Sequence, residues 1–541
     1  MNPPRVHITT YGCQMNQLDS ELVAEVLRSG GAELVADPQA ADVLLFVTCS
    51  VRDHAENRVF SNIGRLAARK RREPHLVVGL LGCMAQEHGP AVRRRAPMID
   101  LVCAPGRLAE LPALIAEARA GRKVDALDSP RSAAARLREE GDASHDSECG
   151  TAGLSSRGGT PATFTTAGQA SRATMPGPKM ENPRCGPAAF AASDAALDDA
   201  EVRRPLCGSS PGQAYVVAIR GCDNFCSYCV VPLVRGPERS RAPAVILEEV
   251  RRLVGQGARQ ITLLGQAVNK YAAQEGGRRW DLADLLAKVA ETPGLTRLSF
   301  ITSHPASMTE RLAQVFRDVP AVIPYLHMPA QAGSDAVLAR MNRGYTVAEY
   351  LDRVAMVRAM RPGLAAASDF IVGFPGESEA DFEATCDLVR RARFSGAFVF
   401  KYSPRLGTAA AKRLTDDVPD AEKRRRNSAL LLLVEEITGE ENRKFVGRTV
   451  RVFVEKLSPR PHAKKGSDPS TDKGSDPFFA ASNPQSAIRN PQLRGRTPCN
   501  RIVVFDGLPS LVGTEVDVEV VDASPLTLFA RADSLAGRDL R

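Results

Sequence analysis

Short apolar runs alternate with helical patterns through the first part of the chain. The apolar runs occupy residues 6–11, 43–47, 75–81 and 99–102, and segments with helical spacing lie between them at 18–27 and 53–72. Fully apolar strands separated by helices are typical of a parallel sheet covered on both faces. The pattern therefore predicts an N-terminal parallel α/β domain over residues 1–125.

The periodic pattern disappears over residues 126–212. Ala, Ser, Gly, Thr and Pro dominate this stretch, which has too few spaced apolar residues to bury a core. Structureless segments of this length are rare inside a compact domain, so the stretch should lie between two domains. We expect a low-complexity linker that has no regular structure from about residue 130 to residue 210.

Ordered alternation resumes at Ala214. Six strand-like segments follow at residues 215–219, 261–264, 298–301, 325–327, 369–372 and 398–402, with helical patterns between them, for example at 244–255, 282–291 and 380–391. Six successive βα units predict a partial (β/α)6 barrel over residues 213–443. Barrels of this kind place their chemistry at the carboxyl ends of the strands.

The tail of the chain changes pattern again. Val-rich strand candidates lie at residues 448–456, 501–505, 515–521 and 527–531, and they predict a small β-barrel of the nucleic-acid-binding kind over 444–534. A low-complexity insertion at 458–493 interrupts this module. Within the insertion, Lys-Gly-Ser-Asp-Pro at 465–469 recurs at 473–477, which indicates an inserted linker and not a solenoid repeat.

Composition narrows the class of protein. The chain has 541 residues, a formal net charge of +8 and twelve cysteines, which are too few for a disulfide scaffold in a chain of this length. The charge permits a polyanionic partner without requiring one. The N-terminus lacks the pattern of a signal peptide, and the longest apolar runs are about half of the ~20 residues that a membrane span needs. We expect a cytoplasmic monomer with no membrane partner.

Three closely spaced cysteines give the strongest chemical signal. Cys222, Cys226 and Cys229 form a Cys-x3-Cys-x2-Cys motif directly after the first barrel strand. Three thiolates can hold three irons of a [4Fe–4S] cluster and leave the fourth iron open for a small chelating ligand. Zinc is the alternative metal, but its structural sites use four ligands, and no Cys or His follows at zinc-finger spacing.

A second set of cysteines is dispersed along the N-terminal domain. Cys13, Cys49 and Cys83 each follow an apolar strand candidate, and the ends of parallel strands share one edge of a sheet. The three thiols should therefore converge, although buried cysteines without a ligand role are common. Cys103 also ends a strand and is a possible fourth ligand, but we expect it to be a bystander. We interpret the remaining cysteines as plain thiols: Cys149, Cys185, Cys207, Cys386 and Cys499.

Several segments together resemble the radical-SAM methylthiotransferases. They are Thr-Tyr-Gly-Cys-Gln-Met-Asn at 10–16, Gly-Cys-Met-Ala-Gln at 82–86, the Cys222–Cys229 motif, Arg-Gly-Pro-Glu-Arg-Ser-Arg at 235–241, Leu-Gly-Gln at 264–266, Thr-Ser-His-Pro at 302–305, Gly-Phe-Pro-Gly-Glu at 373–377 and Tyr-Ser-Pro-Arg-Leu-Gly-Thr at 402–408. The resemblance covers residues 6–115, 214–457 and 494–532. It is strongest to the branch that acts on N6-isopentenyladenosine next to the anticodon of tRNA. The chain departs from the family pattern at Val47, Ala267 and Ala332 and in its two low-complexity insertions.

The resemblance implies a cofactor set and a reaction. S-Adenosylmethionine would bind the open iron of a [4Fe–4S] cluster on Cys222, Cys226 and Cys229 and give a 5′-deoxyadenosyl radical that removes hydrogen from C2 of the adenine. A second [4Fe–4S] cluster on Cys13, Cys49 and Cys83 would supply the sulfur, and a second S-adenosylmethionine the methyl group. The implied partners are tRNA carrying isopentenyladenosine and an electron donor such as flavodoxin or ferredoxin. The C-terminal module resembles the TRAM domain, which binds tRNA in this family.

Gly-rich and polar groups follow the barrel strands and are candidate S-adenosylmethionine contacts. They are Gly265, Gln266, Gly373, Gly376 and Glu377. Glycine would let the backbone approach a ligand closely, while the alternative role of each is a tight βα turn. His304, which follows the third strand, could instead have a purely structural role and donate a hydrogen bond to a loop carbonyl.

The evidence for RNA binding in the sequence is weaker. Basic runs lie at residues 69–72, 93–95 and 423–426, where they could meet phosphates or only form solvated helix faces. Two other functions stay open. One is the same chemistry on threonylcarbamoyl-adenosine or on a ribosomal protein side chain, and the other is a non-catalytic iron–sulfur or zinc protein that binds RNA.

Overall fold

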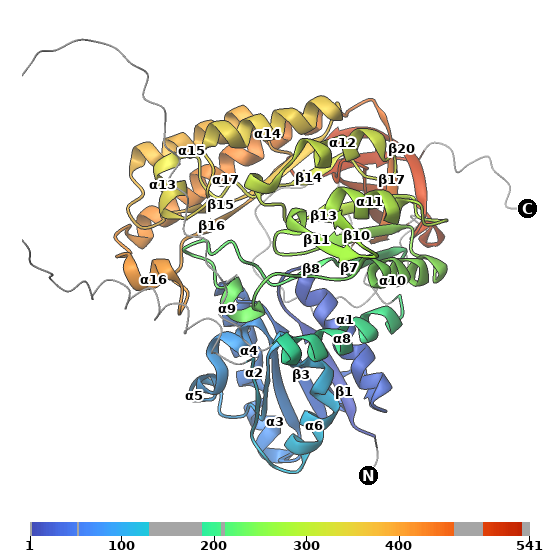
Figure 1. Cartoon of the computed structure of the whole chain (residues 1–541), viewed down its shortest axis with the longest axis vertical. Coiled ribbons are helices and arrows are strands. Elements are labelled where there is room, and N and C mark those ends of the chain that lie inside the picture. The colour runs from blue at the N-terminus through green and yellow to red at the C-terminus, as the bar shows by residue number, and fades with distance from the viewer. Residues whose placement is uncertain (1–2, 51–52, 129–186, 207–210, 459–490, 533–541) are drawn as a thin grey trace, which may run out of the picture. The chain divides into compact units, whose positions relative to one another are not determined.

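The computed structural model describes residues 3–50, 53–128, 187–206, 211–458 and 491–532 (Figure 1). Most of the expected linker and the repeated Lys-Gly-Ser-Asp-Pro segments lie outside the described residues. No helix in the described ranges is long and apolar enough to cross a membrane.

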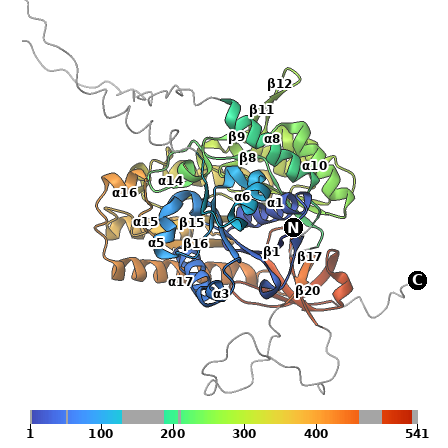
Figure 2. The same cartoon turned by 90° about the horizontal axis from the view of Figure 1, so that it is seen from below.

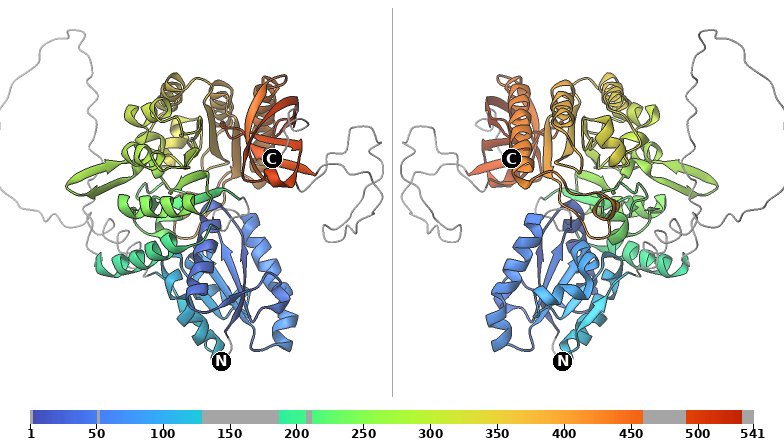
Figure 3. Two further views of the ribbon diagram at one scale, coloured as in Figure 1. Left: turned by 90° about the vertical axis from the view of Figure 1, so that its right-hand side faces the viewer. Right: turned by 90° about the vertical axis from the view of Figure 1, so that its left-hand side faces the viewer.

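A six-stranded parallel sheet forms the N-terminal part of the chain. Its strand order is β2 (Glu33–Leu34), β1 (Arg5–Thr10), β3 (Val43–Thr48), β4 (Val77–Gly82), β5 (Leu101–Cys103) and β6 (Val124–Ala126). Alternate residues of β3 face opposite sides, because Val43 and Leu45 pack with α1 (Gln14–Ser29) and α6 (Leu111–Arg119) while Leu44 and Phe46 pack with α2 (Asp53–Arg65), α4 (Cys83–His88) and α5 (Val92–Arg95). The short helix α3 (Ala67–Arg72) follows α2. The predicted parallel α/β fold is confirmed, with helices on both faces of the sheet (Figure 3).

Six strands form the partial barrel that the sequence predicts, in two three-stranded parallel sheets. They are β7 (Gln213–Val217), β10 (Gln260–Leu264), β13 (Arg297–Ile301), β14 (Tyr325–His327), β15 (Ala365–Val372) and β16 (Gly396–Lys401). The two sheets are ordered β13-β10-β7 and β14-β15-β16. One face of these strands packs against the helices α10 (Pro243–Gly255), α11 (Leu282–Ala290), α12 (Glu310–Asp318), α14 (Val347–Met360), α15 (Glu379–Ala392) and α17 (Asp420–Arg443). The opposite face is the inner face of the barrel.

Short elements decorate the barrel. They are the pair β8 (Ile219–Arg220) and β9 (Arg239–Ser240), the helices α9 (Val231–Arg235), α13 (Asp335–Arg340) and α16 (Ala409–Arg413), and the hairpin of β11 (Ala272–Glu275) and β12 (Arg278–Asp281). The hairpin projects away from the strands of the barrel (Figure 2). The β8–β9 pair flanks the Cys222–Cys229 segment.

A closed five-stranded barrel forms the C-terminal module. Its strands are ordered β17 (Thr449–Leu457), β18 (Gln492–Arg496), β19 (Ile502–Asp506), β21 (Leu528–Arg531) and β20 (Glu515–Ala523). The sequence pattern missed β18, whose Arg-Gly-Arg ending is neither apolar nor alternating. Because β18 begins at Gln492, the predicted insertion at 458–493 extends too far at its C-terminal end. Pairing with β17 and β19 on either side holds this strand in spite of its composition.

The expected linker also contains a helix. Residues Pro187–Arg203 form α8, although the sequence pattern predicts no regular structure there. Leu197 and Ala200 join the core beside α1, and the acidic residues Asp194, Asp198 and Glu201 pair with arginines of the barrel. Among the described side chains of α8, the contacts with the rest of the chain are mostly ion pairs, so hydrophobic periodicity gave little sign of this helix.

Candidate functional site

The three dispersed cysteines meet at one edge of the N-terminal sheet. Cys13 follows β1, Cys49 follows β3 and Cys83 follows β4, and these three strands are neighbours in the sheet. The Cys13 and Cys49 thiols share a hydrogen bond, and Cys83 lies close enough for a charge on Cys13 to influence it. The topology thus places the three thiols together.

Two glycines allow this close approach. Gly12 has φ +133°, and a Cβ there would lie 2.5 Å from Cβ of Cys49. Gly82 has φ +93°, and a Cβ there would lie 2.7 Å from the Thr48 carbonyl oxygen. Larger residues at either position would push the cysteine-bearing loops apart.

Asn16 connects the loop that carries Cys13 to the end of β3. Its buried amide accepts a hydrogen bond from the Cys13 thiol at 3.2 Å and donates one to the Thr48 carbonyl at 2.9 Å. An amide with one acceptor and one donor group is suited to this bridge. Asn16 therefore fixes Cys13 relative to the end of β3.

A buried arginine supplies positive charge to this set of thiols. Arg235 Nε donates to Sγ of Cys83 at 3.2 Å, and Nη2 of the same side chain pairs with Asp19 at 2.5 Å. The hydrogen bond with Cys49 lowers the pKa of Cys13 to about 6, and the nearby Arg235 acts in the same direction. Burial raises the pKa of Cys83 to about 11. Arg235 thus favours the thiolate form, which is the form that binds metals.

The Cys222–Cys229 loop is folded onto itself and onto the loop that follows α9. The Cys222 amide donates to the Gly236 carbonyl at 3.2 Å, and the Cys229 amide donates to the Cys226 carbonyl at 2.9 Å. Gly221 has φ +75°, and a Cβ there would lie 2.0 Å from the Pro237 carbonyl oxygen. This crowding requires glycine directly before the first cysteine.

A second buried arginine contacts the loop cysteines. Arg343 Nη1 donates to Sγ of Cys226 at 3.2 Å, and its other nitrogens bond the Tyr345 hydroxyl and the Pro329 carbonyl. Burial raises the pKa of Cys222 to about 11 and that of Cys229 to about 12. Each cysteine trio therefore has one buried guanidinium that donates to a sulfur, and sequence reasoning predicted neither arginine in this role.

The spacing of the sulfurs differs from that of a tetrahedral zinc site. Tetrahedral zinc with Zn–S bonds of about 2.3 Å holds its sulfurs about 3.8 Å apart. Within the described part of the chain, the one set of three metal-ligand atoms that all lie within 4.8 Å of one another belongs to Glu56, Glu87 and His88. As placed, neither cysteine trio has all three sulfurs this close together. Arg405 already pairs with Glu56 at 3.2 Å in the acidic set.

The other cysteines have different surroundings. The Cys103 thiol is fully buried in the apolar core beside α1 and α6, where it donates weakly to the Ala104 carbonyl at 3.5 Å. Cys386 is buried in α15, and Cys499 contacts the Thr497 hydroxyl. Cys149, Cys185 and Cys207 lie outside the described residues.

The Gly373–Glu377 turn packs against α17. A Cβ on Gly373 would lie 2.3 Å from Cγ of Lys423, so the close approach here is to the chain itself. The Glu377 carboxylate accepts hydrogen bonds from the Gly373 amide at 3.0 Å and from Arg426 at 2.7 Å. Burial raises the pKa of Glu377. We expected Gly373 to open space for a ligand, but on this side the Lys423 side chain fills that space.

Buried polar atoms without partners gather after β10 and β13. Within the described residues, no hydrogen bond reaches Gln266 Oε1, Ser303 Oγ or His304 Nε2. Burial lowers the pKa of His304 to about 3, so its imidazole is neutral at physiological pH. Buried polar atoms normally find partners, and three unpaired ones at neighbouring strand ends indicate a ligand site. The predicted contacts Gly265 and Gln266 belong to this group.

Much of the basic character in the predicted RNA-binding runs is used internally. Arg69 bonds the Pro38 carbonyl and Glu73, and Arg93 bonds the Ile99 carbonyl and Asp125. In the third run, Lys423 pairs with Asp416, and Arg426 with Glu377. These residues stabilise the fold, so these side chains are poorly placed to meet phosphate.

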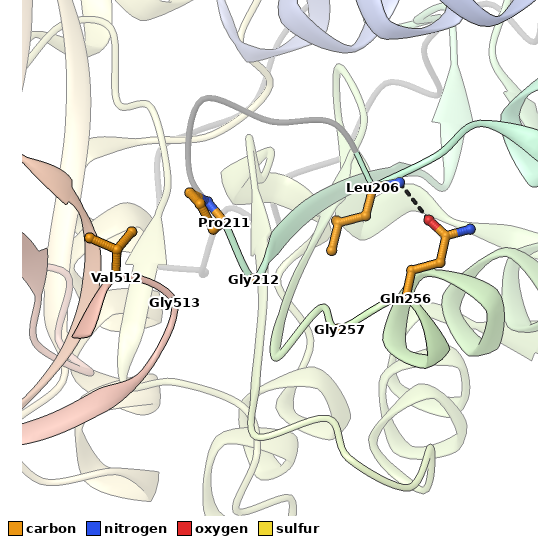
Figure 4. Close-up of a pocket in the computed structure, with 7 residues that line it drawn as sticks. All are labelled: Leu206, Pro211, Gly212, Gln256, Gly257, Val512 and Gly513. Carbon is orange, nitrogen blue, oxygen red and sulfur yellow. Dashed lines mark hydrogen bonds between the residues drawn. The ribbon is translucent and has the colours of Figure 1, made fainter. Parts of the chain in front are cut away.

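A shallow pocket of about 370 Å³ lies beside β7 (Figure 4). Its lining offers little chemistry, and consists of Leu206, Pro211, Gly212, Gln256, Gly257, Val512 and Gly513. The Gln256 side chain accepts a hydrogen bond from the Leu206 amide at 2.5 Å. None of the described residues that line this pocket has a titratable side chain.

Three known families match consecutive parts of the chain. Residues 5–104 match the family described as uncharacterized protein family UPF0004, residues 216–389 match the radical SAM superfamily, and residues 484–532 match the TRAM domain. The three matched segments correspond to the N-terminal sheet, the partial barrel and the C-terminal barrel, in that order.

Full-length relatives carry a common name. The chain is 38% identical to the tRNA-2-methylthio-N(6)-dimethylallyladenosine synthase of Rhodopirellula baltica, over 98% of this chain and 96% of the relative. It is 36% identical to the synthase of the same name from Neisseria gonorrhoeae, over 97% and 98% of the two chains. Among solved structures, the radical S-adenosylmethionine methyltransferase TsrM from Kitasatospora setae matches with a TM-score of 0.46 and 13% identity, over 76% of this chain and 77% of that chain.

Proposed function

Because the chain belongs to the family of tRNA-2-methylthio-N(6)-dimethylallyladenosine synthases, which are radical SAM enzymes, we propose that it inserts a methylthio group at C2 of N6-isopentenyladenosine next to the anticodon of tRNA. The observation that carries this proposal is that the elements bearing the two cysteine trios pack against each other beside the barrel. Met15 and Leu18 of α1, which begins after Cys13, pack on Val217 and Leu264 at the ends of β7 and β10.

The Cys13/Cys49/Cys83 trio also contacts the segment that follows the Cys222–Cys229 loop. Cys83 packs against Val230 and Val234, and Val230 directly follows Cys229. A sulfur-supplying site and a radical-generating site must both reach one substrate atom, so their closeness supports a single active site that both cysteine trios share.

Membership of the radical SAM superfamily brings a [4Fe–4S] cluster and S-adenosylmethionine. We assign this cluster to Cys222, Cys226 and Cys229 and propose a second [4Fe–4S] cluster on Cys13, Cys49 and Cys83. When bound, the two clusters with S-adenosylmethionine supply the radical, the sulfur and the methyl group. The chain itself holds the thiols, places Arg235 and Arg343 against two of the sulfurs, and excludes water from them.

We propose that S-adenosylmethionine lies against Gly265 and Gln266, where the unpaired polar atoms of Gln266, Ser303 and His304 would gain partners. Neutral His304 suits a ligand that already carries a positive sulfonium, because a second cation there would repel it. Gly373 and Glu377 would then shape the neighbouring wall through their contacts with Lys423 and Arg426 of α17. Gly376 would do so through its hydrogen bonds with Arg340 and Asp417.

The TRAM domain is the proposed site for tRNA in this modular arrangement. We propose domains at residues 1–125, 213–443 and 444–534, a monomer without a membrane partner, and flavodoxin or ferredoxin as the electron donor. Three buried polar atoms at the ends of β10 and β13 have no partner among the described residues, which favours an enzyme over a non-catalytic RNA-binding protein.

The experiment that tests the function is mass spectrometry of nucleosides after anaerobic reaction with isopentenylated tRNA, S-adenosylmethionine and a reductant. We expect 2-methylthio-N6-isopentenyladenosine and 5′-deoxyadenosine. Product only on threonylcarbamoyl-adenosine or on a ribosomal protein would move the chain to another branch. Absence of 5′-deoxyadenosine from iron-loaded enzyme would exclude the reaction.

A further inference from the structure

Two aromatic side chains of β16 lie outside the buried core, Phe398 exposed and Phe400 half-buried. Phe398 is 56% exposed, and its ring stacks on Phe400 with a centroid distance of 6.4 Å and an interplanar angle of 20°. Aromatic residues bury large apolar areas when they stabilise a fold. A stacked pair that is not buried is therefore better explained by a ligand than by the core.

Strand register places this pair on the inner face. Phe398 lies beside Asp369 of β15, and Phe400 lies beside Ile371. The intervening Phe370 is fully buried in the core against the helices, and Val399 packs on the same side. Because successive strand residues face opposite sides, Phe398 and Phe400 point away from the helices.

The end of β16 lies close to the radical cluster loop. Tyr402, two residues beyond Phe400, packs edge-on against Phe374 at 5.1 Å, and Phe374 packs against Tyr228 of the Cys222–Cys229 loop at 6.5 Å. The Ala410 amide also bonds the Ser227 carbonyl at 2.7 Å.

The loop after β16 also reaches the N-terminal domain. Arg405 pairs with Glu56 of α2, the helix that follows Cys49. The carboxyl end of β16 is thus linked to both of the elements that carry cysteine trios.

A polar pair borders the aromatic surface. His327 Nε2 lies 3.3 Å from Oδ1 of Asp369, and Asp369 is the lateral neighbour of Phe398. A purine presents a flat π-face together with polar groups at its edge, and so matches an aromatic surface with a carboxylate and an imidazole beside it.

We propose that Phe398 and Phe400 are the stacking platform for the target purine of the tRNA. This inference rests on the proposed function and deepens it, because it names the side chains that hold the base out of the RNA stack beside the two cysteine sites. Enzymes that modify a base within RNA commonly hold it between aromatic or apolar side chains, since every base has a π-face to offer.

The test uses the iron-loaded full chain and an anticodon stem–loop with 2-aminopurine at the target position. We expect the wild type to quench the 2-aminopurine fluorescence on binding. Phe398→Ala and Phe400→Ala should each lose the quenching and bind the stem–loop roughly 5- to 150-fold more weakly, the range for loss of one base stack. Phe398→Trp should restore quenching, because tryptophan stacks at least as well.

Phe398→Leu keeps an apolar side chain without a π-face and guards against failure to fold. Leu432→Ala, at a residue that is 66% exposed on α17, is the matched surface control and should behave as wild type. Iron content and circular dichroism establish folding for every variant. Wild-type quenching and affinity in folded Phe398→Leu and Phe400→Ala would overturn the platform, even if methylthio product confirms the reaction. Failure of wild type to modify an isopentenylated stem–loop would instead reject the proposed function.

Discussion

Arg235 Nε donates a hydrogen bond to Sγ of Cys83 at 3.2 Å, although the two residues are 152 positions apart in the chain. The cysteine belongs to the N-terminal sheet and the arginine to the end of α9 in the barrel region. Arg343 repeats the relationship with Cys226 at the same distance. Charged donors to sulfur stabilise thiolates and lower their electron-donating power, so these two arginines should tune both sites.

Arg235→Lys is expected to weaken the Cys13/Cys49/Cys83 site selectively. Lysine keeps the charge but lacks the planar fork that reaches Cys83 and Asp19 together. Two [4Fe–4S] clusters correspond to about eight irons per chain, and the variant should approach about four after anaerobic reconstitution. Iron and sulfide analysis measures this change. A wild-type chain that reaches only about four irons would contradict the second cluster itself.

Replacement of single cysteines should separate the two sites by role. Cys222→Ala, Cys226→Ala or Cys229→Ala should abolish both 5′-deoxyadenosine and methylthiolated tRNA, because the site for S-adenosylmethionine is incomplete. Cys13→Ala, Cys49→Ala or Cys83→Ala should still form 5′-deoxyadenosine but no methylthio product.

The matched control for these variants is Cys103→Ala, which should keep full activity. Circular dichroism verifies that every variant is folded. Methylthio product at the wild-type rate from Cys13→Ala would contradict the sulfur-supplying role. Loss of product in Cys103→Ala with 5′-deoxyadenosine retained would indicate a fourth thiolate.

Gln266→Ala should raise the KM for S-adenosylmethionine by roughly 2- to 10-fold, the effect of losing one ordinary hydrogen bond. The reason is that Gln266 Oε1 is buried without a partner within the described residues. Gln256→Ala, at the pocket of Figure 4, is the matched amide control and should leave this KM unchanged. Equal KM values in both variants would remove Gln266 from the ligand site.

A deletion that stops before α8 and one that removes α8 should have different effects on stability. Removal of residues 131–185 should preserve activity, because their composition cannot build a core. Extending the deletion to residue 205 also removes Asp198 and Glu201, which pair with the partly buried Arg220 and the buried Arg241. Breaking buried ion pairs costs about 3–5 kcal/mol each, so thermal unfolding should show a large fall in Tm for the longer deletion alone.

Glu21 should make stability depend on pH. Burial raises the pKa of this carboxyl from 4.5 to about 7, even though Arg204 lies against it. A raised carboxyl pKa means that the folded chain binds more protons than the unfolded chain in this window, so its contribution to the free energy of unfolding is lost as pH rises from about 4.5 to about 7. Thermal unfolding between pH 5.5 and 7.5 should show this slope, and Glu21→Gln should flatten it. A steeper slope in the variant would contradict the assignment.

Local patterns predicted the sheet, the partial barrel and most of the C-terminal barrel. Apolar strands and helical spacing can be recognised from a few neighbouring residues in the sequence. The convergence of Cys13, Cys49 and Cys83 follows from the same patterns, since parallel topology brings strand ends together. Arg235 and Arg343 could not be predicted, because contacts over 152 and 117 positions depend on tertiary packing. Helix α8 was not predicted for a related reason. Its partners Arg220, Arg239 and Arg241 lie in a later part of the sequence.

The bond between Arg235 and Cys83 also has a consequence for maturation. During synthesis, the three cysteines of the N-terminal sheet leave the ribosome well before the arginine that compensates their charge. Until Arg235 docks, these thiols lack one of their cationic partners, so a cluster held by Cys13, Cys49 and Cys83 would be bound less tightly. Loading of the proposed cluster would therefore be coupled to completion of the barrel, and a truncated chain that ends before Arg235 should release its iron readily.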